Sequence, residues 1–301
     1  MRRLDIGIAS FNNPEKLDET IRRLREHCRT DFKIFVIDNA SPDPAVRPVI
    51  ERHAAEESRI VPVFLPENIG YAGAVTKLLT IAESEYIAYV DNDAWIETPG
   101  WDEMFADCLD RCHEVGMVFP GGGPYPIRRR GGYTEIMWGV GFCWMINRMV
   151  MPDIVARDRG FPMMKEEDYG KFDTSIGHQE EVDFQTRLRL AGWIPAALPE
   201  VQVVHHASSS TDPASQERIN RGVIAWMNKW TWIFCGKNVN YHSANVMRIA
   251  DWPPFALYLE EFFTSRLPVL NKEPEVVTIE GTEYDLIRVP RLRHYYRGRI
   301  I

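Results

Sequence analysis

Strand-like and helix-like segments alternate through about the first 120 residues, and no other feature limits the fold as strongly. Apolar, β-rich runs are expected to form strands at 4–10, 32–38, 60–65 and 86–91. Amphipathic runs are expected to form helices at 14–27, 44–57 and 72–84. Strands separated by helices imply a largely parallel sheet with helices on both faces, and right-handed crossovers place the loops after the strands on one side. The chain is therefore predicted to be an α/β protein that binds its ligand at the carboxyl ends of these strands.

The loops expected at these strand ends carry acids, amides and glycines. They are Phe11-Asn12-Asn13, Asp38-Asn-Ala-Ser41, Glu67-Asn-Ile-Gly-Tyr-Ala-Gly73 and Asp91-Asn92-Asp93. Asp91 and Asp93 follow an apolar run, so both carboxylates are expected to reach solvent together. Hard oxygen ligands suit Mg²⁺ or Mn²⁺ carrying phosphates better than they suit Zn²⁺. A metal site is therefore predicted here, and the alternative is that the acids only cap a turn or the next helix.

Composition excludes several classes of protein. The formal net charge of −8 over 301 residues argues against a surface built as a whole to hold nucleic acid. No glycine-rich loop matches the dinucleotide fingerprint or the P-loop, which argues against a dehydrogenase or an ATPase. The five cysteines are scattered, which favours buried thiols over a zinc site. With neither a secretory signal nor an apolar run long enough to cross a bilayer, the protein is expected in the reducing cytoplasm.

Two segments in the middle of the chain are candidates for contact with substrate. The stretch 121–132, with Arg128 to Arg130, is expected to be a long mobile loop, either merely exposed or lying over substrate phosphate. The aromatic run 136–147 is expected to be a buried strand pair. Its glycines, including Gly141 beside Trp138, would also let a substrate approach the backbone.

The next segment is expected to form a helix and then a strand. The helix runs from about 178 to 190, and the acids Glu180, Glu181 and Asp183 near its start would complement the helix dipole in any case. The strand covers 201–204 and ends at His205-His206. Neighbouring strand residues face opposite ways, so only one of these two histidines can point toward the acids.

The composition changes after about residue 212. A Trp-rich segment at 219–234 is expected to pack as a helix on the rest of the protein, the alternative being peripheral contact with a membrane surface. Another amphipathic helix is expected at 257–266. The tail from Arg288 to Arg299 holds five arginines and no acid.

Several motifs in one unbroken order from 4 to 211 carry a family resemblance. They are Asp38-Asn-Ala-Ser-Pro-Asp43, Asn68-Ile-Gly-Tyr-Ala-Gly73, Asp91-Asn-Asp93, Phe172-Asp173 with Glu180-Glu-Val-Asp-Phe184, Arg187-Leu-Arg-Leu-Ala-Gly-Trp193, and His205-His-Ala-Ser-Ser-Ser-Thr211. Together they resemble the family-2, GT-A-fold inverting glycosyltransferases, particularly the bacterial rhamnosyltransferase-like branch.

The chain departs from that family's pattern at a few places. Glu181 stands where the family usually has Asp, and Thr76 or Lys77 where it has Asn. Ala207-Ser208-Ser209 replaces small glycines, and 160–170 is an insertion. These departures bear on the acceptor far more than on the class of reaction.

The resemblance implies a fold and a division of the chain. The fold is GT-A, the nucleotide-diphospho-sugar transferase fold, with a Rossmann-like mixed α/β sheet, helices on both faces and a C-terminal helical extension. Residues 1–211 would be the catalytic domain, with a donor half at about 1–120 and an acceptor half at about 121–211. Residues 212–301 would be the helical extension and basic tail.

The resemblance also implies roles for the strand-end acids. Asp93 would be the direct ligand of Mn²⁺ or Mg²⁺, and Asp91 would face the ribose or a metal-bound water. His205 would complete the metal site, with His206 as its rival. A divalent cation there would stabilise the charge that develops on a departing diphosphate.

On the acceptor side, the resemblance places the general base at Glu181. A carboxylate in reach of the acceptor hydroxyl can take its proton as it attacks. Glu180 is the alternative base, and as a neighbouring like charge it could raise the pKa of Glu181. Asp183, Trp138 and Gly141 are expected to hold the acceptor or a loop beside it.

For the donor, Asp38 resembles the acid that accepts the imide N–H of uracil or thymine. Asn12, Asn68 and Asn92 would complete that pocket, which Ser10 and Gly70 would border through their backbones. The alternative is that Asp38 and Asn68 each form only an Asx-turn.

The resemblance therefore implies a metal-dependent inverting glycosyltransferase, a hexosyl- or deoxyhexosyltransferase. It would move a sugar from a UDP- or dTDP-linked donor to a hydroxyl of a glycan, a lipid-linked or another acceptor. Two alternatives are weighed: transfer to hydroxylated bases in DNA, suggested by the arginines but opposed by the net charge, and a nucleotidyltransferase or a non-catalytic sugar-binding domain. The nucleotidyltransferase would need a basic, glycine-rich loop after the first strand, where this chain has Ser10-Phe-Asn-Asn-Pro14.

Overall fold

The computed structural model describes most of the first 206 residues and a few segments beyond them. The described residues are 2–121, 126–136, 138–160, 164–177, 179–206, 225–226, 229–230 and the strands 276–279 and 282–285. His178, residues 207–211, the helix expected at 257–266 and the arginine-rich tail lie outside the described residues, as do most of the Trp-rich segment and parts of 121–132 and of the 160–170 insertion.

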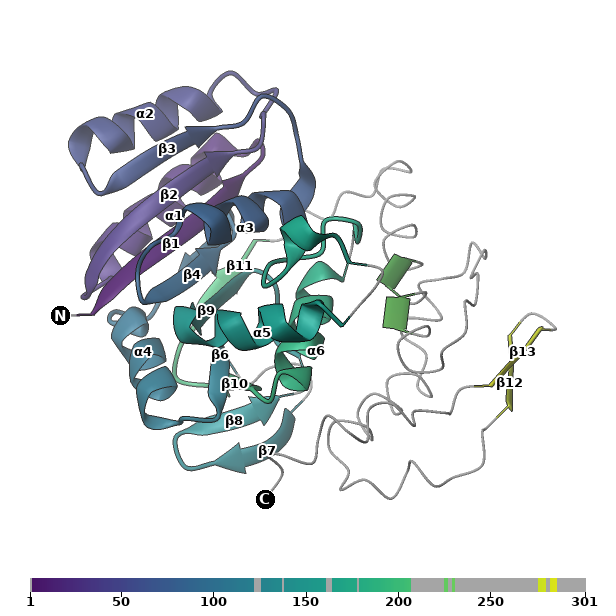
Figure 1. Ribbon diagram of the computed structural model, residues 1–301. Coiled ribbons are helices and arrows are strands. Elements are labelled where there is room, and N and C mark those ends of the chain that lie inside the picture. The colour runs from purple at the N-terminus through teal and green to yellow at the C-terminus, as the bar shows by residue number, and fades with distance from the viewer. Residues whose placement is uncertain are drawn as a thin grey trace.

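The alternation of strands and helices predicted from the sequence is present in residues 3–120 (Figure 1). Its strands are β1 (Arg3–Ser10), β2 (Asp31–Asp38), β3 (Ile60–Phe64), β4 (Tyr86–Val90), β5 (Ala94–Ile96) and β6 (Val115–Pro120). Its helices are α1 (Pro14–His27), α2 (Val46–Glu56), α3 (Gly70–Ile81) and α4 (Trp101–Arg111). The boundaries predicted from the sequence for the first seven elements lie within about three residues of those observed.

The second part of the chain, from residue 126, adds shorter elements. Its strands are β7 (Pro126–Arg130), β8 (Tyr133–Ile136), β9 (Cys143–Asn147), β10 (Ile194–Leu198) and β11 (Val203–His205). Its helices are the single turns η1 (Arg148–Val150) and η2 (Glu166–Asp168), together with α5 (Met151–Asp158) and α6 (Glu180–Leu190). Farther along, β12 (Val276–Ile279) pairs antiparallel with β13 (Thr282–Asp285), a strand pair within the segment expected to be helical.

One large mixed sheet joins the two parts. Among the described residues it has nine strands in the order β3-β2-β1-β4-β9-β6-β10-β8-β7. The pairings from β3 to β4 are parallel, whereas β9 runs antiparallel to both β4 and β6. The observed sheet confirms the predicted mixed α/β fold.

Helices cover both faces of this sheet because each buries an apolar stripe against it. Leu17 and Ile21 of α1 share a buried core with residues of α2 and α4 on one face. Leu78 of α3 and Leu188 of α6 belong to the core on the other face, together with α5. Among the described residues, none of the helices is long and apolar enough to cross a membrane.

The expectation of a mobile loop at 121–132 is wrong for part of that stretch. Residues 126–130 form β7, which pairs antiparallel with β8 at the edge of the sheet. The guanidinium of Arg130 lies 3.3 Å from Glu135 of β8, so this arginine is already paired with a carboxylate. Cross-strand pairing therefore orders a segment whose composition is typical of a loop.

Candidate functional site

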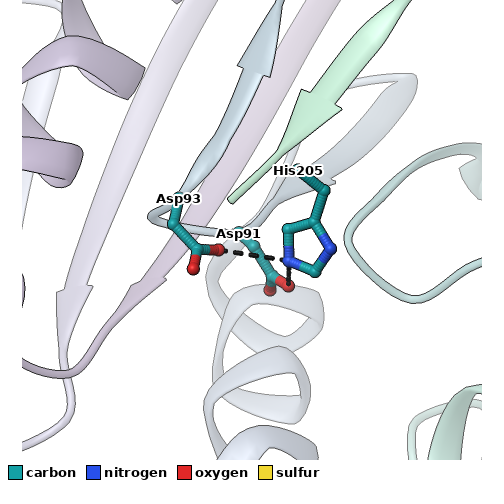
Figure 2. Close-up of side chains that lie close together, drawn as sticks. All are labelled: Asp91, Asp93 and His205. Atoms are coloured by element: carbon teal, nitrogen blue, oxygen red, sulfur yellow. Dashed lines mark ion pairs between the residues drawn. The ribbon is translucent and has the colours of Figure 1, made fainter. Parts of the chain in front are cut away.

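Three side chains meet at the carboxyl end of β4. Carboxylate oxygens of Asp91 and Asp93 and a ring nitrogen of His205 all lie within 4.8 Å of one another, and Figure 2 shows them pointing toward a common centre. His205 Nε2 is 3.2 Å from Asp93 Oδ1 and 3.5 Å from Asp91 Oδ2. Two aspartates one residue apart and a histidine more than 100 positions later in the chain thus form one cluster.

A second, two-stranded sheet explains how His205 reaches the acids. β11 pairs antiparallel with β5, and the register places His205 opposite Ala94, next to Asp93. The ladder continues as the backbone N–H of His206 donates to the carbonyl of Asp93. Because side chains alternate along a strand, His205 turns toward the acids, whereas His206 packs against Trp95 with ring centroids 3.8 Å apart.

The two carboxylates of this cluster attract positively charged groups. Hydrogen bonds to Asp91 and Asp93 raise the pKa of His205 to about 9. Burial disfavours the charged form of Asp93, but His205 and Lys16 outweigh burial and hold the pKa of that carboxyl below its usual range. Lys16 of α1 lies 3.6 Å from Asp93 Oδ2 and donates to the carbonyl of His206. Two carboxylates that draw in an imidazolium and an ammonium fit a site for a divalent cation, and the O,O,N donor set suits Mn²⁺ or Mg²⁺.

Tyr89 orients one of the proposed ligands. Its hydroxyl, on the buried strand β4, donates to Asp91 Oδ1 over 2.5 Å, while Oδ2 is the oxygen nearer His205. Burial is the largest cause that raises the pKa of Tyr89 well above its usual value, and the carboxylate of Asp91 adds to it. The tyrosine therefore stays a neutral donor that holds Asp91 in one rotamer.

Tyr89→Phe should weaken Mn²⁺ binding. The variant keeps the ring but frees Asp91 to rotate. Loss of a group that hydrogen-bonds to a metal ligand typically costs about 10–100-fold in metal affinity. Isothermal titration of Mn²⁺ in the presence of UDP would measure it. Tyr71→Phe is the matched control, because the Tyr71 hydroxyl donates to the carbonyl of Gly141 rather than to a proposed ligand. Equal Mn²⁺ affinity in wild type and Tyr89→Phe would contradict this role.

Glu181 lies close to Tyr71, and both are beside Gly141. A Cβ atom built on Gly141 would lie 3.3 Å from both Glu181 Cγ and the hydroxyl oxygen of Tyr71, so the three residues share one small space. Burial raises the pKa of Glu181, and the negative charge of Asp91 raises it further. The carboxylates of Asp91 and Glu181 also raise the pKa of Tyr71 beyond the effect of burial. The candidate base and the candidate metal site are therefore close enough to influence each other electrostatically.

The other residues assigned to the acceptor side are mostly buried in contacts with the protein. The indole N–H of Trp138 donates to Thr186 Oγ1 of α6 over 3.2 Å, which fixes the ring against that helix. Asp183 is fully buried, and its carboxylate accepts from Arg187 and Trp230. Glu180 is also buried. Their assignments to the acceptor or to catalysis stay predictions, whereas Gly141 lies directly beside Glu181.

The loops predicted to hold the nucleotide are tied together by side-chain amides. Asn12 accepts from the backbone of Asp43, and Asn92 donates to the carbonyl of Asn12.

Asn39, which the sequence reasoning did not single out, links the loop after β2 to the start of α3. It accepts from Ile69 N–H over 2.8 Å and donates to the carbonyl of Gly70 over 3.2 Å. The Asx-turn considered at Asn68 is formed, because Asn68 Oδ1 accepts from Gly70 N–H. Asp38 Oδ1 instead accepts from the N–H of Ser41, three residues later in the turn. The turn uses only Oδ1 of Asp38. The other carboxylate oxygen can therefore accept from the base of a nucleotide while the turn is kept.

Ser10 lies beneath this loop cluster. Its side chain is fully buried at the end of β1, beside Asp38 in the parallel ladder, and its carbonyl accepts from Asn39 N–H. Gly70 has a φ of 74°, a backbone conformation that favours glycine, at the first residue of α3. Phe11 is among the exposed large apolar residues, at 42%.

Sequence reasoning missed Lys16, Asn39, Tyr71 and Tyr89. Tyr71 and Asn39 lie within motifs that the sequence analysis quoted, so their positions were a usable signal. Tyr89 lies two residues before Asp91 and so points to the same face of the strand, which is also readable from the sequence. Lys16 is in the first turn of an expected helix, and nothing in the sequence indicates that it faces Asp93.

Comparisons with known proteins show which family this chain is similar to. Residues 5–119 match the sequence model described as "Glycosyl transferase family 2". N-acetylglucosaminyl-diphospho-decaprenol L-rhamnosyltransferase of Mycobacterium tuberculosis is 23% identical over 77% of this chain and 83% of its own length.

Solved structures give the same fold. A mannosyltransferase from Pyrobaculum calidifontis, in complex with GDP-Man and Mn²⁺, superposes with a TM-score of 0.57 at 16% identity, over 89% of this chain and 71% of that one. Residues 1–349 of TarS from S. aureus, in complex with UDP-GlcNAc, give a TM-score of 0.58 at 15% identity, over 88% of this chain and 74% of that one.

Proposed function

We propose that this chain, which matches glycosyltransferase family 2 over residues 5–119 and shares its fold with solved glycosyltransferases, is a metal-dependent, inverting enzyme that transfers one sugar from a nucleotide-sugar to a hydroxyl acceptor. The observation that carries the proposal is the convergence of Asp91, Asp93 and His205 at the end of β4, with Glu181 close enough to feel the charge of Asp91. The two structures with bound nucleotide-sugars support the choice of donor class.

Asp91, Asp93 and His205 would hold Mn²⁺ or Mg²⁺. A divalent cation held there supplies Lewis-acid stabilisation of the negative charge that develops on the departing diphosphate. Tyr89 keeps Asp91 in place for this role, and the pairing of β11 with β5 keeps His205 in place. The GDP-Man complex of the Pyrobaculum mannosyltransferase contains Mn²⁺, which supports a divalent metal without deciding between Mn²⁺ and Mg²⁺.

Glu181 would take the proton of the acceptor hydroxyl. The acceptor oxygen forms a bond to the anomeric carbon while the bond from that carbon to the diphosphate oxygen breaks, and the hydroxyl proton passes to the Glu181 carboxylate. Attack from the face opposite the leaving diphosphate inverts the anomeric centre. Burial raises the pKa of Glu181. This suits the task, because a stronger base accepts the proton more readily.

A screen of nucleotide-sugars tests the proposal as a whole. UDP-GlcNAc, UDP-glucose, dTDP-rhamnose and GDP-mannose would each be assayed for Mn²⁺-dependent release of the nucleoside diphosphate and for thermal stabilisation of the protein. We expect at least one UDP- or dTDP-linked sugar to be turned over only when a divalent cation is present. If none stabilises the protein or is hydrolysed, the proposed donor class is wrong.

Asp38 should make the donor site prefer pyrimidines. An imide N–H of uracil or thymine can donate to its carboxylate, so UDP or dTDP should bind more tightly than GDP in calorimetric titrations. Asp38→Asn keeps an oxygen for the turn with Ser41. Its amide N–H would then face the imide N–H, and two donors cannot form a hydrogen bond with each other. An unpaired buried polar group costs about 1–3 kcal/mol, so affinity for UDP should fall by roughly 5–150-fold. GDP binding as tightly as UDP to the wild type would refute the assignment.

A further inference from the structure

A second buried cluster of charges lies under helix α6, outside the metal site. The ammonium of Lys229 is 2.7 Å from Asp173 Oδ2 and 2.7 Å from Asp183 Oδ1. The indole N–H of Trp230 donates to the same oxygen of Asp183 over 3.1 Å. The side chains of Lys229, Asp173 and Asp183 are at most 4% exposed. We call these three residues the Lys229 clamp.

Charge balance makes Lys229 necessary to this cluster. Arg187 pairs with the other oxygen of Asp183 and with Asp158, each over 2.8 Å and fully buried. Three buried aspartates thus face two described cations, Arg187 and Lys229. Because an uncompensated buried charge is strongly unfavourable, the clamp holds only while the lysine is in place.

The clamp joins three parts of the chain that are distant in sequence. Asp173 belongs to the loop before α6, and its other oxygen accepts from the backbone and the hydroxyl of Ser175. Asp183 lies in the first turns of α6, two residues after Glu181. Lys229 lies beyond the family match at 5–119 and beyond the boundary near 211 expected from the sequence.

Packing carries the effect of the clamp toward the site. Phe172, next to Asp173, stacks on Phe184 of α6 with ring centroids 5.0 Å apart. The same ring meets Tyr71 edge-on with ring centroids 5.8 Å apart, and Tyr71 lies with Glu181 beside Gly141. A shift of the loop or of the first turn of α6 would therefore displace Glu181 relative to Tyr71 and Gly141.

We propose that Lys229 is a positioning residue, which fastens its own segment to α6 and to the loop before it, and so fixes the first turn of α6 with Glu181 facing the acceptor. This inference rests on the proposed role of Glu181 as base. It makes Lys229 and Trp230 a working part of the proposed acceptor side rather than of a separate extension. The donor side is not involved, since the clamp contacts none of the residues proposed to bind the nucleotide or the metal.

Variants of the full-length chain test this proposal. Lys229→Met removes the charge, Lys229→Arg keeps it, and the double variant Lys229→Met with Asp173→Asn removes both members of one pair. Turnover of the best donor from the screen, the affinity for UDP with Mn²⁺, and the thermal midpoint would be measured for each. A displacement of a catalytic group by about 1 Å can cost about 100-fold, so kcat of Lys229→Met should fall by about 10–100-fold. Donor affinity should stay within about twofold of wild type.

The double variant separates positioning from folding. Neutralising Asp173 relieves the unpaired charge, so the thermal midpoint should recover toward wild type while kcat stays low. Recovery of kcat together with the midpoint, or an equal loss of kcat and donor affinity in Lys229→Met, would overturn the positioning role. Lys229→Arg should retain more activity than Lys229→Met.

Hydrogen exchange gives a readout that does not depend on turnover. Without substrate, amides of 172–190 should exchange faster in Lys229→Met than in wild type, whereas those of β1, β2 and β4 should not change. Unchanged exchange at 172–190 would refute the clamp itself. A wild-type protein that turns over no nucleotide-sugar would instead refute the proposed function. The exchange result would then still show whether Lys229 holds residues 172–190 in place.

Discussion

Asp93→Ala is expected to abolish divalent-dependent transfer. The variant removes a carboxylate that lies beside both His205 and Lys16 and is proposed to bind the metal directly. Lewis-acid stabilisation of a departing diphosphate is worth several kcal/mol, and each 1.36 kcal/mol changes the rate tenfold, so transfer should fall by about 10³-fold or more. Rates with saturating donor and Mn²⁺, and Mn²⁺ affinity in the presence of UDP, would measure the loss.

The two neighbouring histidines provide a matched control for this experiment. His205→Ala should also lose Mn²⁺ affinity, because its Nε2 faces both acids. His206→Phe should retain it, because the ring of His206 packs on Trp95 and a phenyl ring can keep that contact. Full transfer in excess chelator, or equal Mn²⁺ affinity in Asp93→Ala and wild type, would show that the acid cluster binds no catalytic metal.

Much of the fold and of the acid cluster could be predicted from the sequence because both follow from local rules. Alternating strand and helix patterns determine a parallel sheet, and such a sheet brings the ends of β1, β2 and β4 to one edge. That is enough to place Asp38 and Asp91 on the same side of the molecule. The alternation of side chains along a strand also predicts that only one of His205 and His206 faces the acids.

The remaining features depend on pairings that no local pattern specifies. The choice of His205 follows from the register of β11 against β5, which joins residues about 110 positions apart. Residues 126–130 have the composition of a loop, yet they form β7 because β8 offers a free edge. The pairing of Lys229 with Asp173 and Asp183 links segments that the sequence divides at about 211.

The pH dependence of transfer should report the environment of Glu181. Burial and the charge of Asp91 both raise the pKa of this carboxyl above its usual value. A general base works only when deprotonated, so kcat/KM should fall as the pH drops through that raised pKa and should level off above it. The acidic limb of the profile should therefore lie at higher pH than an ordinary glutamate would give. An acidic limb at or below the usual pKa of glutamate would contradict this environment.

Glu181→Gln should remove the chemistry and leave donor binding intact. The amide keeps the shape of the side chain but cannot take the acceptor proton, and loss of a general base typically costs about 10²–10⁴-fold in rate. Affinity for UDP with Mn²⁺ should barely change, because Glu181 lies beside Gly141 and Tyr71 on the proposed acceptor side rather than among the metal ligands.

Glu180→Gln is the matched control, since it makes the same change one residue earlier in the same helix turn. Its effect on kcat should be smaller than that of Glu181→Gln. If Glu180→Gln is inactive while Glu181→Gln turns over normally, the base is Glu180. If neither variant loses activity, the two acids serve only the start of α6. The proton must then leave through another group, because the acceptor hydroxyl has to lose it for transfer to be completed.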